Sequence, residues 1–127
     1  MTRAAHRPRR STVSNFPAQP LSPLDGLYQA AVSALGDFLS EAGLNRARVE
    51  VEVEWLITLT DRGLFGQSPL TDAEKDSLRA LYRDFGQAEI DWLAEREAVT
   101  RHDVKAVEYL VRDRLATQGL DALAEAT

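Results

Sequence analysis

The sequence predicts an all-α protein on two observations. Apolar residues recur at the three- and four-residue spacing of amphipathic helices through most of the chain after Leu27. Proline is absent after Pro69, so nothing in the second half of the chain interrupts a helix in that way. The 127 residues, 44% hydrophobic and 28% charged, have the composition of one ordinary globular domain.

Residues 1–20 differ from the rest and are predicted to form a flexible basic arm. Its formal charge comes from four arginines, Arg3, Arg7, Arg9 and Arg10. Residues 21–127 hold 11 basic and 20 acidic side chains, a net charge of −9. Because phosphate contacts need a basic face, this acidic body argues against nucleic-acid binding. A weak contact between the arm and RNA or an acidic surface stays open.

The sequence also bounds the expected location. No apolar run approaches 18 residues and no charged-then-apolar leader is visible, so we expect neither a membrane span nor a secretory signal. Cysteine is absent, which excludes disulfides and thiol chemistry and fits a reducing compartment. We expect a cytoplasmic protein that does not contact membranes.

The first elements follow from turn and cap chemistry. Ser22–Gly26 is a turn, since it combines proline, aspartate and glycine. Helical spacing from Tyr28 to Ala42 predicts the first helix, with Gly43 as its C-terminal cap.

The segment from about Asn45 to Arg62 fits two structures. Valines alternate with glutamates at its start, as in a half-buried strand. The apolar pattern continues to Gly63, however, which is too long for a typical strand and favours a helix. On a helix the glutamates do not converge, so we expect solvated carboxylates rather than an acid–base pair.

Two further helices are predicted. Thr71 and Glu74 form a capping box that begins a long helix running to about Glu97. A last helix begins at the cap Thr100, with Asp103 three residues later, and ends near Gly119. A short apolar tail follows it.

Arg101, His102 and Asp103 gather at the start of this last helix, where unpaired backbone N–H groups favour an anion. A solvated arginine and a histidine beside a cap explain the same residues without any function. The sequence contains neither a glycine-rich phosphate loop nor the paired-histidine spacing of a metal site, so we expect no metal.

Three stretches together resemble the N-terminal region of adenylosuccinate lyase, a family of the fumarase/aspartase superfamily. They are Ser22–Gly26 with Tyr28, Arg48–Leu56, and Arg101–Leu110. The resemblance extends from Ser22 to about Leu123. It implies that residues 21–127 form the N-terminal helical domain of such a lyase and lack its central helical bundle.

The resemblance also implies an activity. Adenylosuccinate lyases release fumarate by β-elimination from adenylosuccinate and from a related imidazole intermediate of purine biosynthesis. They use no cofactor and are homotetramers whose active sites combine three subunits. Their general-acid histidine and mobile-loop serine lie further along the chain, so no catalytic residue is expected here. We therefore expect a fragment or truncated product that is inactive alone and prone to self-association.

By resemblance, the residues that bind the purine nucleotide substrate are Tyr28, Arg101, His102 and Asp103. The family has an arginine before the tyrosine, where this chain has Leu27. Leucine cannot replace the charged, bidentate grip of arginine on phosphate, so weaker nucleotide binding is expected.

Two other functions stay open. One is a non-catalytic helical interaction module derived from the same domain. The other, less favoured, is a nucleic-acid binder that uses the basic arm.

Overall fold

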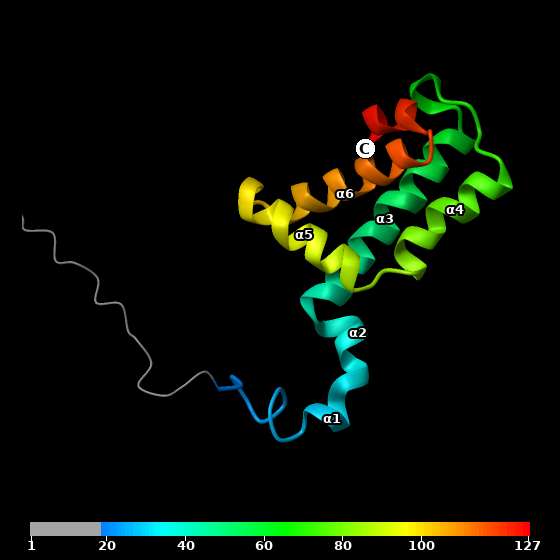
Figure 1. Ribbon diagram of the computed structural model, residues 1–127. Helices are drawn as coiled ribbons and strands as arrows, with labels where there is room; N and C mark the ends of the chain where they lie inside the picture. Colours follow the sequence, from blue (N-terminus) through cyan, green and yellow to red (C-terminus); the bar gives the residue numbers. More distant parts are fainter. Residues whose placement is uncertain (1–18) are drawn as a thin grey trace, which may run out of the picture. The chain divides into compact units, whose positions relative to one another are not determined.

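The structure is a computed structural model that describes residues 19–127 (Figure 1). The described residues divide into two units, 19–34 and Leu35–Thr127. Within the described residues every regular element is a helix, which confirms the predicted all-α class. The predicted arm, residues 1–20, falls almost wholly outside the described residues.

The first unit holds the predicted turn and a single helical turn, α1 (Gln29–Val32). A 3-10 turn, η1 (Ser33–Leu35), follows and ends at the first residue of the second unit. The Asp25 carboxylate accepts hydrogen bonds from the backbone N–H groups of Ser22 at 2.6 Å and Leu21 at 3.0 Å. These bonds, first that of Ser22, lower the pKa of Asp25. The turn predicted at Ser22–Gly26 is confirmed.

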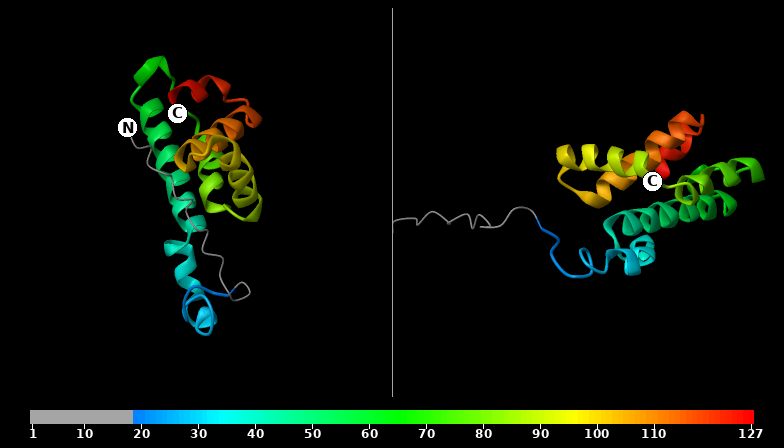
Figure 2. Two further views of the ribbon diagram at one scale, coloured as in Figure 1. Left: turned by 90° about the vertical axis from the view of Figure 1, so that its left-hand side faces the viewer. Right: turned by 60° about the horizontal axis from the view of Figure 1, so that its bottom comes forward.

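The second unit holds the remaining elements. They are α2 (Gly36–Leu39), α3 (Glu41–Asp61), η2 (Leu64–Gly66), α4 (Asp72–Arg83), α5 (Gln87–Thr100), α6 (Asp103–Thr117) and η3 (Asp121–Ala126). Helix α6 packs on both α3 and α5, and α4 packs on α3 (Figures 1 and 2). The chain end folds back on α6 through η3.

The prediction that Gly43 caps a continuous first helix is wrong. The chain breaks at Ser40, whose extended backbone makes it the N-cap of α3, and its hydroxyl accepts from the Gly43 N–H at 3.0 Å. Gly43 is buried in the first turn of α3, where an added Cβ would lie 2.5 Å from the carbonyl oxygen of Asp37. Gly43 therefore permits a close backbone approach between α2 and α3.

The helix predicted from about Asn45 to Arg62 is confirmed as α3, and the strand alternative is wrong. Gly63 ends it as predicted, with a left-handed φ of 61° that glycine adopts readily. The alternating valines divide between faces. Val49 and Val53 are buried, whereas Val51 is 67% exposed.

The single helix predicted from Thr71 to Glu97 is wrong, because the chain breaks into α4 and α5. The capping box at its start is confirmed, since Thr71 and Glu74 exchange backbone-to-side-chain bonds of 2.8 and 3.3 Å. The break falls at Gly86, the N-cap of α5, whose N–H donates to the Glu89 carboxylate at 3.1 Å. In the sequence, Gly86 three residues before Glu89 is the pattern that indicates this second helix start.

The core of the second unit is built mainly from α3 and α6. It comprises Val49, Val53, Leu56, Ile57, Leu78, Leu93, Ala106, Val107, Leu110, Val111, Leu115 and Leu123. Burial of this apolar surface is the main force that stabilises the arrangement. It fixes the start of α6 against the side of α3.

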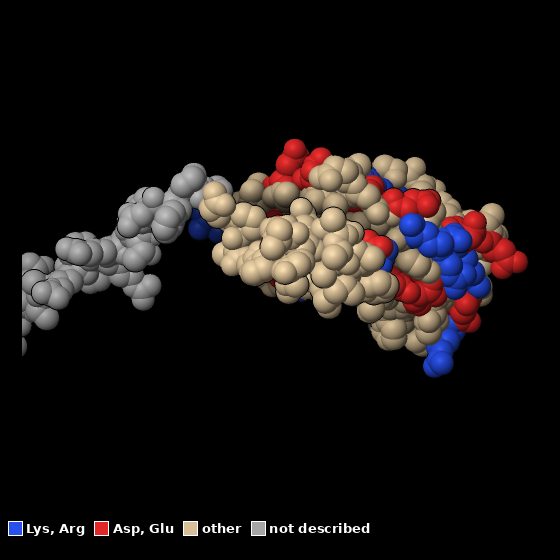
Figure 3. All heavy atoms as spheres, turned by 90° about the horizontal axis from the view of Figure 1, so that it is seen from below, with Lys and Arg blue, Asp and Glu red and all other residues tan. Residues whose placement is uncertain are grey.

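Charged pairs join α4 to α3 at the surface. Arg79 donates two hydrogen bonds to Glu54, at 2.7 and 2.9 Å, and Tyr82 donates a third at 2.9 Å. The bond from Arg79 is the main cause of a lowered pKa of Glu54. On the face drawn in Figure 3, Lys and Arg lie among Asp and Glu rather than apart from them. None of the described helices has the length and apolar character needed to span a membrane.

Candidate functional site

The connection between α5 and α6 is the centre of the candidate site. Helix α5 ends at Thr100, and Arg101 follows with φ 51° and ψ 34°. It is the one non-glycine residue with positive φ between residues 19 and 127. Its N–H donates to the Glu97 carbonyl at 2.7 Å, so this left-handed residue closes α5 and turns the chain into α6. A side chain in this conformation costs about 1–2 kcal/mol.

The prediction that Thr100 caps the last helix, with Asp103 completing a box, is wrong. His102 is the N-cap of α6, and its Nδ1 accepts from the Lys105 N–H at 3.2 Å. Thr100 instead holds the connection, since its hydroxyl accepts from the His102 N–H at 3.3 Å. A threonine that still belongs to α5 cannot take the extended backbone that an N-cap requires.

The cap fixes the chemistry of the imidazole. Because Nδ1 of His102 accepts a hydrogen bond, the proton of the neutral ring is on Nε2, which becomes a donor. The His102 side chain is 64% exposed, so this donor is available to a ligand. The ring is not packed in the apolar interior.

Asp103 begins α6 and is bound to α3. Its Oδ2 lies 2.9 Å from a terminal nitrogen of Arg48, and its Oδ1 lies 3.9 Å from Nδ1 of His102. The Val104 N–H, followed by the Arg48 guanidinium, holds the pKa of Asp103 below its usual range. Asp103 is thus a carboxylate whose charge is balanced by α3.

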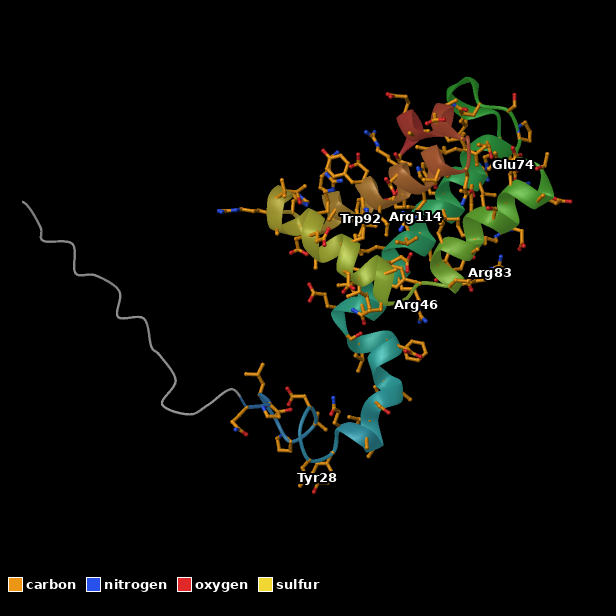
Figure 4. The ribbon with its side chains drawn as sticks, in the orientation of Figure 1. Tyr28, Arg46, Glu74, Arg83, Trp92 and Arg114 are labelled. Carbon is orange, nitrogen blue, oxygen red and sulfur yellow. The ribbon has the colours of Figure 1, made fainter. Side chains whose placement is uncertain are left out.

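Cationic side chains also lie close to aromatic rings of α5 and α6. The Arg96 guanidinium lies 4.9 Å from the Trp92 ring centre and 5.6 Å from that of Tyr109. Lys105 pairs with Glu108 at 2.6 Å, so its charge is matched within α6. Figure 4 labels Trp92 on α5 and Arg114 on α6.

An apolar groove of about 280 Å³ lies between α3 and α6, beside the Arg48–Asp103 pair. It is lined by Leu44, Ala47, Arg48, Val51, Glu52, Val104 and Val107. Val104, on the first turn of α6, is 48% exposed. The groove is therefore an open apolar surface next to charged groups.

The structure brings three of the four predicted site residues together, since Arg101, His102 and Asp103 are consecutive at the α5–α6 connection. Tyr28 belongs to the first unit, just before α1, and is 55% exposed (Figure 4). Its part in a shared site stays a prediction.

The sequence prediction missed the contribution of Arg48. Arg48 lies in one of the three stretches that resemble the family, but no local pattern links it to Asp103, which is far away in the chain. No group of three or more His, Asp or Glu suited to a metal ion occurs within residues 19–127.

The fold and the junction define the class: an all-α protein with an exposed histidine and a balanced carboxylate at the start of a helix. No family model matches the chain. Individual proteins named adenylosuccinate lyase, however, are similar to it in sequence. The chain is 34% identical over 115 residues to that of Dictyostelium discoideum, 37% over 99 residues to that of Haemophilus influenzae, and 38% over 97 residues to that of Escherichia coli K12.

These matches cover 85%, 77% and 76% of this chain, respectively. By sequence the chain is thus related to adenylosuccinate lyases over most of its own length, and the resemblance inferred from its motifs is confirmed. It spans about a fifth to a quarter of the length of these curated relatives, 24%, 22% and 21%.

Proposed function

We propose that this chain supplies part of the substrate-binding surface of an adenylosuccinate lyase, as the N-terminal part of that enzyme. The observation that supports this most directly is the exposed His102, whose cap leaves Nε2–H as a donor toward solvent. An anion at this position meets the N-terminus of α6 as well. Similarity to enzymes named adenylosuccinate lyase supplies the substrate class.

The proposed reaction is a β-elimination that breaks a C–N bond and releases fumarate. A base removes the proton beside a carboxylate, and an acid protonates the departing nitrogen. We assign neither role to residues of this chain. Its residues bind and orient the anionic substrate, whereas the acid and base come from the rest of a homotetrameric, cytoplasmic enzyme, and the chain alone is inactive.

The test removes the imidazole but keeps the helix cap. We expect His102→Ser to weaken adenylosuccinate binding by about tenfold or more, since a hydrogen bond to a charged group contributes roughly 1.5–3 kcal/mol. Serine is a good N-cap, so the free energy of unfolding should change little. Binding is measured by NMR titration of the chain with adenylosuccinate at millimolar concentrations.

The control for this titration is Arg83→Gln, which removes a cation from the end of α4 (Figure 4). It should leave the affinity within about twofold of the native value. Equal affinity of native and His102→Ser chains would contradict the proposed role of His102.

A second prediction concerns the missing arginine before Tyr28. We expect Leu27→Arg to tighten adenylosuccinate binding, by up to about tenfold, because arginine grips phosphate through two charged hydrogen bonds. Leu27 is 82% exposed, so the longer side chain requires no repacking. Leu24→Arg adds the same charge to the same unit at a 59% exposed position. An equal gain in both variants would show a general charge effect and refute the prediction.

The apolar groove between α3 and α6 favours a second function, that of a non-catalytic helical interaction module. The two functions differ in an assay of fumarate release, performed with and without subunits of a complete adenylosuccinate lyase. A rate of fumarate release that rises when this chain is added supports the enzyme. A rate that this chain does not change, with or without the added subunits, supports the module.

A further inference from the structure

We propose that Arg48 is a positioning residue of the junction site: it balances the charge of Asp103 and thereby lets an anion approach His102. The inference rests on the proposed function, because the anion is the nucleotide substrate of that site. It assigns a role to a residue of α3, outside the helix start that carries His102.

The contacts of Arg48 fix its guanidinium at this place. One terminal nitrogen lies 2.9 Å from Oδ2 of Asp103, and the other donates to Oδ1 of Asn45 at 3.1 Å. The Arg48 side chain is only 26% exposed. Two different nitrogens of the guanidinium are thus bound, one to α3 itself and one to α6, which limits its alternative positions.

The electrostatic need for Arg48 follows from the distance between Asp103 and the imidazole. Oδ1 of Asp103 lies 3.9 Å from Nδ1 of His102, so an anion bound at Nε2 lies within a Debye length of this carboxylate. We take about 7 Å as the distance between the Asp103 carboxylate and one negative charge of an anion bound at Nε2. If Asp103 were not balanced, their repulsion would weaken binding by roughly 3-fold in water-like surroundings and roughly 50-fold at the dielectric of a protein surface. A dicarboxylate that carries phosphate suffers this repulsion more than once.

Lys105, on the first turns of α6, does not take this role. Lys105 is paired with Glu108, at 2.6 and 2.7 Å from its two carboxylate oxygens. The Arg48–Asp103 pair, in contrast, crosses from α3 to α6 and stands at the edge of the candidate site. A purely structural role for this pair, pinning α6 to α3, is the alternative that the test must separate.

The test is a double-mutant cycle read out as adenylosuccinate affinity. We expect Arg48→Gln to weaken binding by about tenfold in 20 mM salt and by much less in 1 M salt, where the Debye length falls to about 3 Å. The double variant Arg48→Gln/Asp103→Asn removes both charges of the pair, so it should recover binding to within about twofold of the native affinity.

Arg79→Gln is the matched control. It breaks a comparable arginine–carboxylate pair between α4 and α3, away from the junction, and should leave the affinity unchanged. The free energy of unfolding of every variant is measured in parallel. A double variant that binds as weakly as Arg48→Gln alone, or a loss of binding that salt does not reduce, would show a structural role and overturn the inference.

The outcomes also separate the inference from the proposed function. If the native chain does not bind adenylosuccinate, or binds it equally after His102→Ser, both fail. If His102→Ser abolishes binding while Arg48→Gln leaves it unchanged at low salt, the proposed function stands and the inference alone is refuted.

Discussion

Replacing Leu56 with alanine is expected to lower the free energy of unfolding by about 2–5 kcal/mol. Leu56 is fully buried in α3, within the core that α3 shares with α4, α5 and α6. The change removes apolar contacts and leaves a cavity that rigid neighbours fill only in part. Small domains have a total stability of about 5–15 kcal/mol, so the loss is a large share of it. Urea denaturation followed by circular dichroism measures it.

Leu44→Ala is the control for this change, because it makes the same truncation on the same helix. Leu44 is 48% exposed and lines the apolar groove, so its loss should cost about 1 kcal/mol or less. Similar losses at Leu44 and Leu56 would show that the predicted interior is not a packed core.

Gly43→Ala is expected to destabilise the second unit by about 1–3 kcal/mol, although alanine is the better helix former. The new Cβ would lie 2.5 Å from the carbonyl oxygen of Asp37 and 2.8 Å from its carbonyl carbon. Both atoms belong to the backbone of α2, so α2 must move away from α3. Denaturation gives the energy, and amide shifts of residues 36–43 locate the displacement.

Gly36→Ala tests this steric explanation. Gly36 is the first residue of α2, and an added Cβ there meets nothing within 4 Å. This change should be neutral or stabilise the protein, by up to about 1 kcal/mol, through the helix preference of alanine alone. A stabilising effect of Gly43→Ala as well would refute the close approach of α2 and α3.

The helix boundaries that the sequence predicted correctly have an unambiguous local signal. Helix α3 is predicted by its length and by the stop at Gly63, and the start of α4 by the capping box of Thr71 with Glu74. The errors occur where two local explanations compete. Gly43 fits a helix end by residue type, but Ser40 is the better N-cap, and the chain restarts there.

In the candidate site, too, the sequence predicted some features correctly and left others between two local explanations. The cluster of Arg101, His102 and Asp103 and its place at a helix start were evident in the sequence. Which side chain caps the helix was not, because Thr100 and His102 both offer an acceptor and only the reversal at Arg101 decides between them. That reversal depends on how α5 and α6 pack.

By itself, the sequence determined the helical class, the end of α3, the start of α4 and the kinship with adenylosuccinate lyases, since periodicity, caps and motif order are properties of neighbouring residues. Only the tertiary structure decided that His102 turns Nδ1 inward to its own helix, and that Arg48 meets Asp103. The physical reason is that the cap at His102 follows from the way α5 turns into α6. The contact of Arg48 with Asp103 follows from the shared core of α3 and α6, which brings their side chains to 2.9 Å from one another.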